Sequence, residues 1–135
     1  MKFLFSVLLM AGIAGSTFAQ QQKTQPLPMP YYIKMLDSTS SIDVVFMQGA
    51  GGSISLEGHS AKLFNRYFER ETTQKLNTPQ AGSIMWQING REFLSGNIFL
   101  GDTIGCVVIT KNGREYVNRI SPQGNAFFKT QGKKQ

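Results

Sequence analysis

The sequence predicts a mainly β fold, an antiparallel β-sandwich or barrel of about eight short strands with one amphipathic helix inserted after the third strand. Three observations support this prediction. Short runs rich in β-branched and aromatic residues recur along the chain, Gly- and Asn-containing turn signals separate them, and one stretch has helical periodicity. The alternative is an α+β arrangement in which the helix packs on a curved antiparallel sheet.

The first predicted strands follow one another closely. Residues 31–36 and 42–47 are rich in β-forming side chains, and a turn-prone segment separates them. After a glycine-rich break, residues 53–57 alternate between polar and apolar, which places Ile54 and Leu56 on one face of a strand. These runs are the first three strands of the predicted fold.

One helix is predicted after the third strand. Ser60 is a favourable N-cap residue, and Asn77 with the residues that follow it ends the pattern. Glu71 and Lys75 have the i, i+4 spacing of an exposed ion pair on such a helix. The apolar stripe that should face the sheet consists of Leu63, Phe64, Tyr67 and Phe68.

Two Asn-Gly pairs, at residues 89–90 and 112–113, predict β-hairpins with two-residue turns, because both residues of such a turn need positive φ. Further short strands are predicted at residues 98–100 and 126–128. The turns also set the cross-strand pairs, which are Trp86 opposite Phe93 and Ile109 opposite Tyr116.

The N-terminus has the pattern of a secretory signal peptide over residues 1–19. Lys2 supplies a positive charge, residues 3–13 form an apolar core, and Ala19 precedes a cleavage position that has small residues at −1 and −3. The apolar stretch is too short to span a bilayer core of about 30 Å. We therefore expect a secreted or periplasmic protein that is soluble after signal-peptide cleavage and has no integral membrane span.

The remaining chain divides into three expected segments. A Gln/Pro-rich leader at residues 20–30 should be an extended linker. Residues 31–129 should form a single β-rich domain, and residues 130–135 a basic tail.

The charge balance allows two interpretations, an anionic partner or charge that serves only solubility. The formal net charge of +6 falls to +5 when Lys2 leaves with the signal peptide, and a moderate excess of this kind attracts acidic polysaccharide or envelope polymer. Charge that serves only solubility is the alternative interpretation. The basic residues are scattered and not interleaved with aromatics, so nucleic acid is not an expected partner.

The chain has one cysteine and one histidine, which limits its chemistry. Cys106 lies in an apolar strand-like run and is expected to be buried. No metal site is expected, because a closed zinc site needs about four ligands, and no cofactor is expected, because the glycine-rich residues 49–53 lack a nucleotide fingerprint. Glu57 and His59 are weak catalytic candidates for acid-base chemistry.

Two aromatic doublets are the candidate binding residues. Because side chains alternate along a strand, one ring of each doublet should point outward. A lysine beside the second doublet adds positive charge. The full candidate set is Tyr31, Tyr32, Phe127, Phe128 and Lys129.

These observations favour an exported, non-enzymatic binding or interaction module that acts on a cell-envelope component, which is an anionic glycan, an envelope polymer or an envelope protein. Binding through a β edge or an aromatic-basic face is the expected mode. Two alternatives remain: a small secreted hydrolase that uses carboxylate and histidine acid-base chemistry, and a structural subunit of an envelope assembly. The sequence leaves the oligomeric state open.

Overall fold

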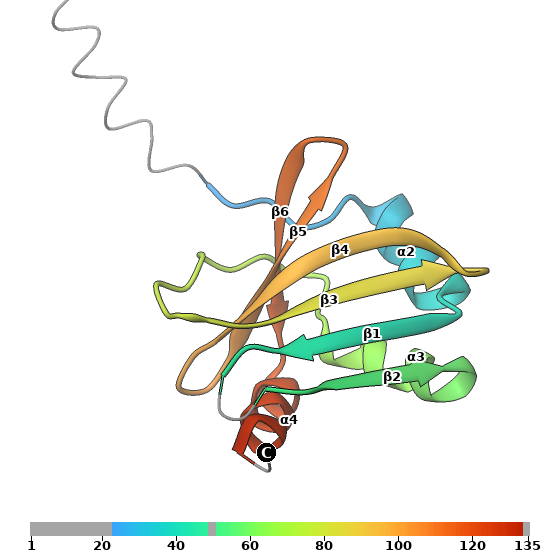
Figure 1. Ribbon diagram of the computed structural model, residues 1–135. Helices are drawn as coiled ribbons and strands as arrows, with labels where there is room; N and C mark the ends of the chain where they lie inside the picture. Colours follow the sequence, from blue (N-terminus) through green and yellow to red (C-terminus); the bar gives the residue numbers. More distant parts are fainter. Residues whose placement is uncertain (1–22, 49–50, 134–135) are drawn as a thin grey trace, which may run out of the picture.

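One antiparallel sheet of six strands, in the order β2-β1-β3-β4-β5-β6, forms the framework, and helices pack on one of its faces (Figure 1). The computed structural model describes residues 23–48 and 51–133, so the expected signal peptide and the first residues of the leader lie outside the described residues. The elements in chain order are α2 (Met29–Ser38), β1 (Ser41–Phe46), β2 (Ser53–Glu57), α3 (Gly58–Phe64), the 3-10 turn η1 (Asn65–Tyr67), β3 (Gln80–Ile88), β4 (Arg91–Leu100), β5 (Gly105–Lys111), β6 (Arg114–Ile120) and α4 (Pro122–Lys133).

The expected mainly antiparallel β fold is confirmed, with the strands in a single twisted sheet that does not close into a barrel (Figure 1). This architecture corresponds to the alternative arrangement, helices on a sheet. The strand count is six because residues 31–36 and 126–128 are helical and residues 98–100 continue β4. Within residues 23–48 and 51–133, none of the helices has the length and apolar content that a membrane crossing requires.

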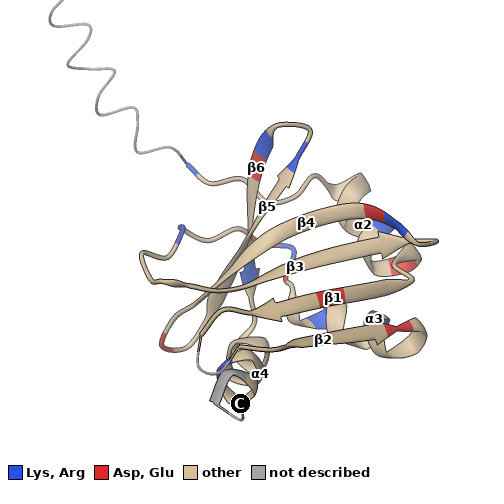
Figure 2. Ribbon diagram, in the orientation of Figure 1, with Lys and Arg blue, Asp and Glu red and all other residues tan. Residues whose placement is uncertain are grey.

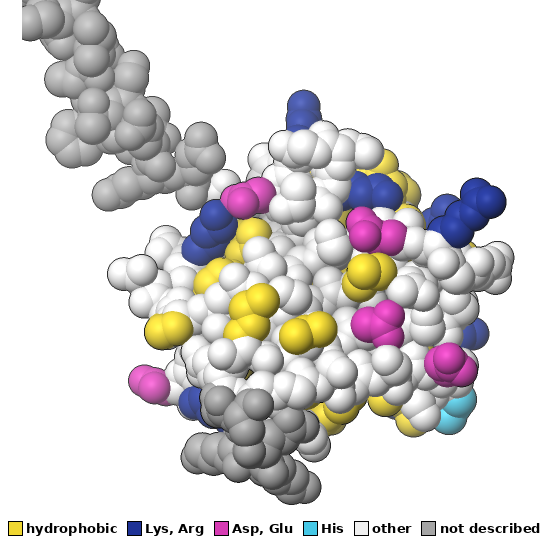
Figure 3. All heavy atoms as spheres, viewed as in Figure 1, with side chains coloured by type: hydrophobic (Ala, Val, Ile, Leu, Met, Phe, Trp, Pro, Cys, Tyr) yellow, Lys and Arg dark blue, Asp and Glu magenta, His cyan; other side chains and the backbone are white. Residues whose placement is uncertain are grey.

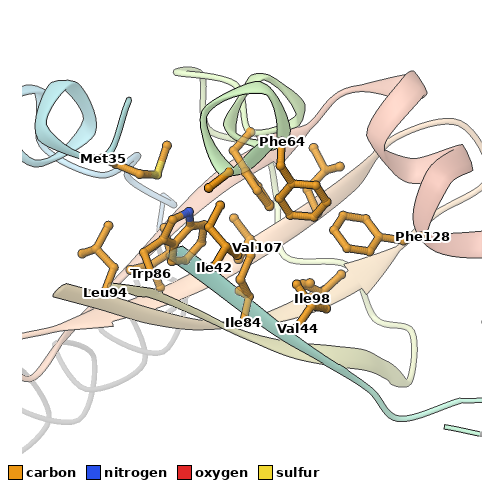
Figure 4. Close-up of a cluster of buried hydrophobic side chains, with 14 of the residues drawn as sticks. Met35, Ile42, Val44, Phe64, Ile84, Trp86, Leu94, Ile98, Val107 and Phe128 are labelled. Carbon is orange, nitrogen blue, oxygen red and sulfur yellow. The ribbon is translucent and has the colours of Figure 1, made fainter. Parts of the chain in front are cut away.

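The hydrophobic core lies between the helices and the face of the sheet that they cover (Figure 4). Trp86 of β3 is fully buried, and its ring centroid lies 5.2 Å from that of Phe68 in an edge-to-face arrangement. Phe64 of α3 contacts Phe68 and Phe128 in the same geometry, at 5.7 and 5.6 Å. Edge-to-face pairs add about 0.5–1.5 kcal/mol each beyond their area burial, so this aromatic cluster ties three segments to the sheet.

The strand predicted at residues 31–36 is wrong, because this segment belongs to helix α2. Pro30 lies in the first turn, where a missing N–H is tolerated. Met35 is buried, and Tyr31, Tyr32 and Leu36 pack partly against the core. Their spacing is helical, and this periodicity outweighs the β propensity of the individual residues.

The strand predicted at residues 126–128 is also wrong, since it lies in helix α4. The hydroxyl oxygen of Ser121 accepts a hydrogen bond from the N–H of Gly124 at 3.1 Å, and Pro122 is the first helical residue. This is a standard helix start. The change from strand to helix places Phe128 in the core, 3% exposed.

The helix predicted after β2 is shorter than expected. It begins at Gly58, has no side-chain cap and gives way to η1, so Ser60 is not its N-cap. Phe68 already forms a β-bridge with Ile120. The expected helical pair of Glu71 and Lys75 is therefore wrong, and the Lys75 ammonium instead lies 2.6 Å from the carboxylate of Glu115.

Both predicted hairpin turns are confirmed. Asn89 and Asn112 each have a φ of 53°, and the glycines that follow them also have positive φ. The cross-strand pair of Ile109 and Tyr116 is confirmed as well. The pair of Trp86 and Phe93 is wrong, because a bulge in β4 places Leu94 opposite Trp86.

The outer side of β6 is covered by two segments of the chain. The Val117 N–H donates to the carbonyl of Gln25 at 2.7 Å, and the Arg119 N–H donates to the carbonyl of Glu71 at 2.9 Å. The side-chain oxygen of Asn118 accepts a hydrogen bond from the buried Leu27 N–H at 2.8 Å. The described end of the leader is therefore docked on the sheet.

Candidate functional site

A bulge in β4 determines where one aromatic ring lies. Trp86 faces Leu94, and Gln87 faces Glu92, so Phe93 has no partner residue on β3. An extra residue of this kind bends a strand and redirects its side chain, and such bulges are frequent beside functional sites. The ring of Phe93 packs at the rim of the core, 6.2 Å from the ring of Tyr31 on α2.

Two lysine side chains meet at this ring. The ammonium nitrogen of Lys34, from α2, lies 5.3 Å from the Phe93 ring centroid, and that of Lys111, from β5, lies 4.9 Å from it. Lys111 is also 5.7 Å from the ring centroid of Tyr31. We call these four residues the aromatic–basic cluster. Each cation–π contact stabilises the arrangement by about 0.5–1 kcal/mol at an exposed site.

One ammonium group of the cluster is held in place. Lys111 Nζ donates a hydrogen bond to the backbone carbonyl of Phe93 at 2.7 Å, and Asn112 Nδ2 lies 3.5 Å from the Tyr31 hydroxyl. Lys34 is exposed, with its side chain free to adjust. The cluster thus combines one fixed and one adjustable positive charge.

Neither lysine of the cluster is neutralised by a carboxylate in the described part of the chain. The ion pairs found there join Lys75 to Glu115 and Arg119 to Glu69. Both ammonium groups lie within 5.3 Å of the same ring centroid, so together they give this rim of the core a positive potential. The cluster can therefore hold a carboxylate, sulfate or phosphate group next to an aromatic surface.

The face of the sheet that the helices leave uncovered has a different character (Figure 3). It has a shallow hollow of about 270 Å³ over β1, β3, β4 and β5, whose lining includes Asp43, Ser83, Met85 and Asn97. Several of its polar groups are already bonded: the Gln87 amide nitrogen donates to Asp43 at 3.0 Å, and the Ser83 hydroxyl lies 3.5 Å from the side-chain oxygen of Asn97. A ligand in this hollow would therefore be held more by the concave surface than by unbonded polar groups.

Charge is distributed unevenly around the sheet (Figure 2). Asp43 lies on β1, and Glu57 and Glu92 lie at the ends of β2 and β4. Basic residues lie on α2 and on the β5–β6 hairpin, the elements that form or adjoin the cluster, together with the acidic residues Asp37 and Glu115 (Figure 2). An anionic ligand is thus attracted to the cluster more than to the uncovered face.

The other candidate binding residues do not gather around one point. The Tyr32 hydroxyl donates to the carbonyl of Phe68 at 2.8 Å, and burial raises the pKa of this phenol. Phe127 stacks on Tyr67 with ring centroids 5.4 Å apart, far along the chain from α2. Lys129 is half-buried on α4. Of the predicted set, the structure brings Tyr31 alone into contact with the lysines of the cluster.

The candidates for acid-base catalysis lie on the surface. Glu57 is exposed at the end of β2, and His59 is exposed at the start of α3. Neither lines the hollow of the uncovered face. Across residues 23–48 and 51–133, no three His, Cys, Asp or Glu side chains come together in a group that could hold a metal ion.

The single thiol is buried, as the sequence predicts. Cys106 is 0% exposed and packs with Val108 and Val117 between the strands and Leu76. Desolvation by this apolar surrounding raises the pKa of the thiol. A thiol of this kind is a poor nucleophile, which argues against covalent catalysis by Cys106.

Three residues of the cluster are absent from the set predicted by sequence. Lys34, Phe93 and Lys111 come from separate segments, and nothing in their local patterns connects them. Phe93 and Tyr116 each stand three residues after the glycine of an Asn-Gly turn. This shared position was the one feature of the sequence that drew attention to Phe93. No known family, curated protein or solved structure matches this chain.

Proposed function

We propose that this chain is an exported, non-enzymatic binding module that holds an anionic glycan of the cell envelope at the aromatic–basic cluster. The observation that carries the proposal is the pair of un-neutralised ammonium groups, those of Lys34 and Lys111, on the ring of Phe93. Export rests on the signal-peptide pattern of residues 1–19.

Recognition at this site has two components. A carboxylate or sulfate group accepts hydrogen bonds from the two ammonium groups, whose separation can adjust through the flexible stem of Lys34. The rings of Tyr31 and Phe93 supply an apolar surface beside the charge, which suits the carbon-bound hydrogens of a sugar ring. The basic excess of the whole chain raises the local concentration of an acidic polymer.

The test measures binding of the purified protein to heparin and to polygalacturonate, with neutral dextran as the control polymer. We expect binding to both acidic polymers, none to dextran, and affinity that falls steeply between 0.05 and 0.5 M salt, where the Debye length shrinks from about 14 to about 4 Å. Lys34→Gln should weaken binding about fivefold, since an exposed charge contact contributes about 1 kcal/mol.

A matched control removes a positive charge elsewhere. Lys62 is exposed on α3, and Lys62→Gln should leave the affinity within about twofold of the unmodified protein, because the long-range contribution of one charge is small. Equal weakening by Lys34→Gln and Lys62→Gln would show nonspecific charge attraction and would refute a site at the cluster. Binding that does not respond to salt would refute the anionic ligand.

A further inference from the structure

In the described part of the chain, segments outside the sheet form hydrogen bonds with one edge strand, β6, but not with the other, β2. At β6, the N–H groups of Val117 and Arg119 are bonded to neighbouring segments. At β2, which is the other edge of the sheet, hydrogen bonding is to β1 alone among the described residues. The outer side of β2 therefore presents unpaired backbone donors and acceptors.

The register shows which residues face outward at this edge. The Phe46 N–H donates to the carbonyl of Gly52, and the Gly58 N–H donates to the carbonyl of Ser40. Backbone groups alternate in direction along an antiparallel strand. The even-numbered residues of β2 therefore bond to β1, and the groups that point away from the sheet belong to Ser53, Ser55 and Glu57.

Apolar side chains beside this edge are incompletely covered. Ile54 and Leu56, on the helix-covered face of β2, are only partly buried. Leu63 of α3, the helix that packs beside β2, is 43% exposed. A further strand at the edge would cover part of this surface as well as the backbone groups.

The sequence of the edge is complementary to itself. We propose that β2 pairs with β2 of a second copy of this chain, antiparallel and centred on Ser55, to join two six-stranded sheets into one. In this register all three outward residues meet outward residues of the other copy. The cross-strand pairs are Gly52 with Gly58, Ser53 with Glu57, Ile54 with Leu56, and Ser55 with itself.

Each pair in this register is favourable or neutral. Apolar residues meet apolar residues, and Glu57 meets a serine, so no like charges lie directly opposite. Glycine faces glycine at both ends of the paired segment. Shifting the register by two residues in either direction leaves outward groups unpaired, so full overlap of the five-residue strand selects this one alignment.

Ser55→Pro tests the pairing without disturbing the fold. The Ser55 N–H points away from the sheet, so proline there removes no hydrogen bond to β1, and edge strands tolerate proline. The matched control is Ser55→Ala. It removes the same hydroxyl contact with Asp43, at 2.6 Å, but keeps the N–H.

The measurements are the solution mass by light scattering from 10 μM to 1 mM and the amide exchange rate of Ser55. We expect the mass of the unmodified protein and of Ser55→Ala to rise toward that of two chains, and the Ser55 amide to exchange at least tenfold more slowly at the high concentration. Ser55→Pro should keep the mass of one chain throughout.

Two outcomes overturn the proposal. The first is a single-chain mass at 1 mM, which would leave the edge to an extended segment of another protein. The second is a dimer that Ser55→Pro does not weaken. If that variant fails to fold, Ser55→Lys replaces it, because two ammonium groups opposite each other at the centre of the pair should abolish the dimer at low salt and restore it partly at high salt.

Discussion

The indole N–H of Trp86 donates a hydrogen bond to the side-chain oxygen of Asn65 at 2.8 Å, and both residues are fully buried. The amide nitrogen of Asn65 in turn donates to the carbonyl of Met35 at 3.0 Å. One polar side chain thus connects the centre of the sheet, η1 and helix α2.

Asn65→Ala should lower the free energy of unfolding by about 2 kcal/mol, because the buried Trp86 N–H then has no acceptor. Chemical denaturation followed by tryptophan fluorescence measures this loss, since Trp86 is the one tryptophan. Asn77 is exposed, and Asn77→Ala serves as the control, with an expected change within about 0.5 kcal/mol. Equal stability of the two variants would contradict the structural role of Asn65.

Asn118 should hold the end of the leader against β6. It accepts from the Leu27 N–H at 2.8 Å and donates to the carbonyl of Glu69 at 2.8 Å. In Asn118→Ala both partners lose their bond, so we expect a loss of about 2 kcal/mol and faster exchange of the Leu27 amide. Unchanged protection of that amide would show that packing of the Leu27 side chain alone retains the leader.

The burial of Cys106 predicts that its thiol reacts slowly and that its contribution to the free energy of unfolding depends on pH. Its raised pKa means that the folded state favours the protonated thiol. This contribution to stability is complete below the ordinary thiol pKa of about 8.5 and is lost as the pH rises above it toward the folded-state pKa. The free-energy difference between the protein and Cys106→Ala should therefore shrink between pH 8 and pH 10.

A labelling experiment checks the same residue independently. A thiol reagent should react with Cys106 much more slowly in the native protein than in 6 M urea, because the side chain is 0% exposed. Rapid labelling of the native protein at pH 7 would contradict the burial.

Two substitutions of Gly113, in the second hairpin turn, should lower the free energy of unfolding by different amounts. Gly113 has a φ of 77°, and a Cβ at this position meets no atom within 4 Å. Gly113→Ala should therefore cost about 1 kcal/mol for the left-handed backbone alone. Gly113→Asn should cost less, since asparagine adopts this conformation more readily. Thermal melts of both variants distinguish backbone strain from crowding.

The sequence predicted the strands well where local pattern and tertiary role agree. The alternation at residues 53–57 gave β2 with its observed bounds, and the Asn-Gly pairs gave both hairpins. The prediction failed at α2 and α4, where Tyr, Ile and Phe residues have high β propensity but the apolar positions recur at helical spacing. Start signals such as Ser121 before Pro122 were present in the sequence.

The residues of the candidate site were harder to predict from the sequence than the fold was. Tyr31 was predicted to bind, but its partners depend on a bulge that directs Phe93 toward α2. A one-residue irregularity between β3 and β4 leaves no mark in the alternation of residues 91–100. Lys34 and Lys111 also lie far apart in the sequence, and the docking of α2 brings both to the ring of Phe93.

The segments that cover the edge at β6 limit how far strand pairing can extend the sheet. The N–H groups of Val117 and Arg119 are already bonded to flanking segments of the chain, so among the described edges β2 is the more open to a further strand. Proteins whose sheets are open on both sides can polymerise into fibres, strand after strand. Here the segments that dock on β6 obstruct strand addition at that edge, so the β2 pairing proposed above would stop at two copies.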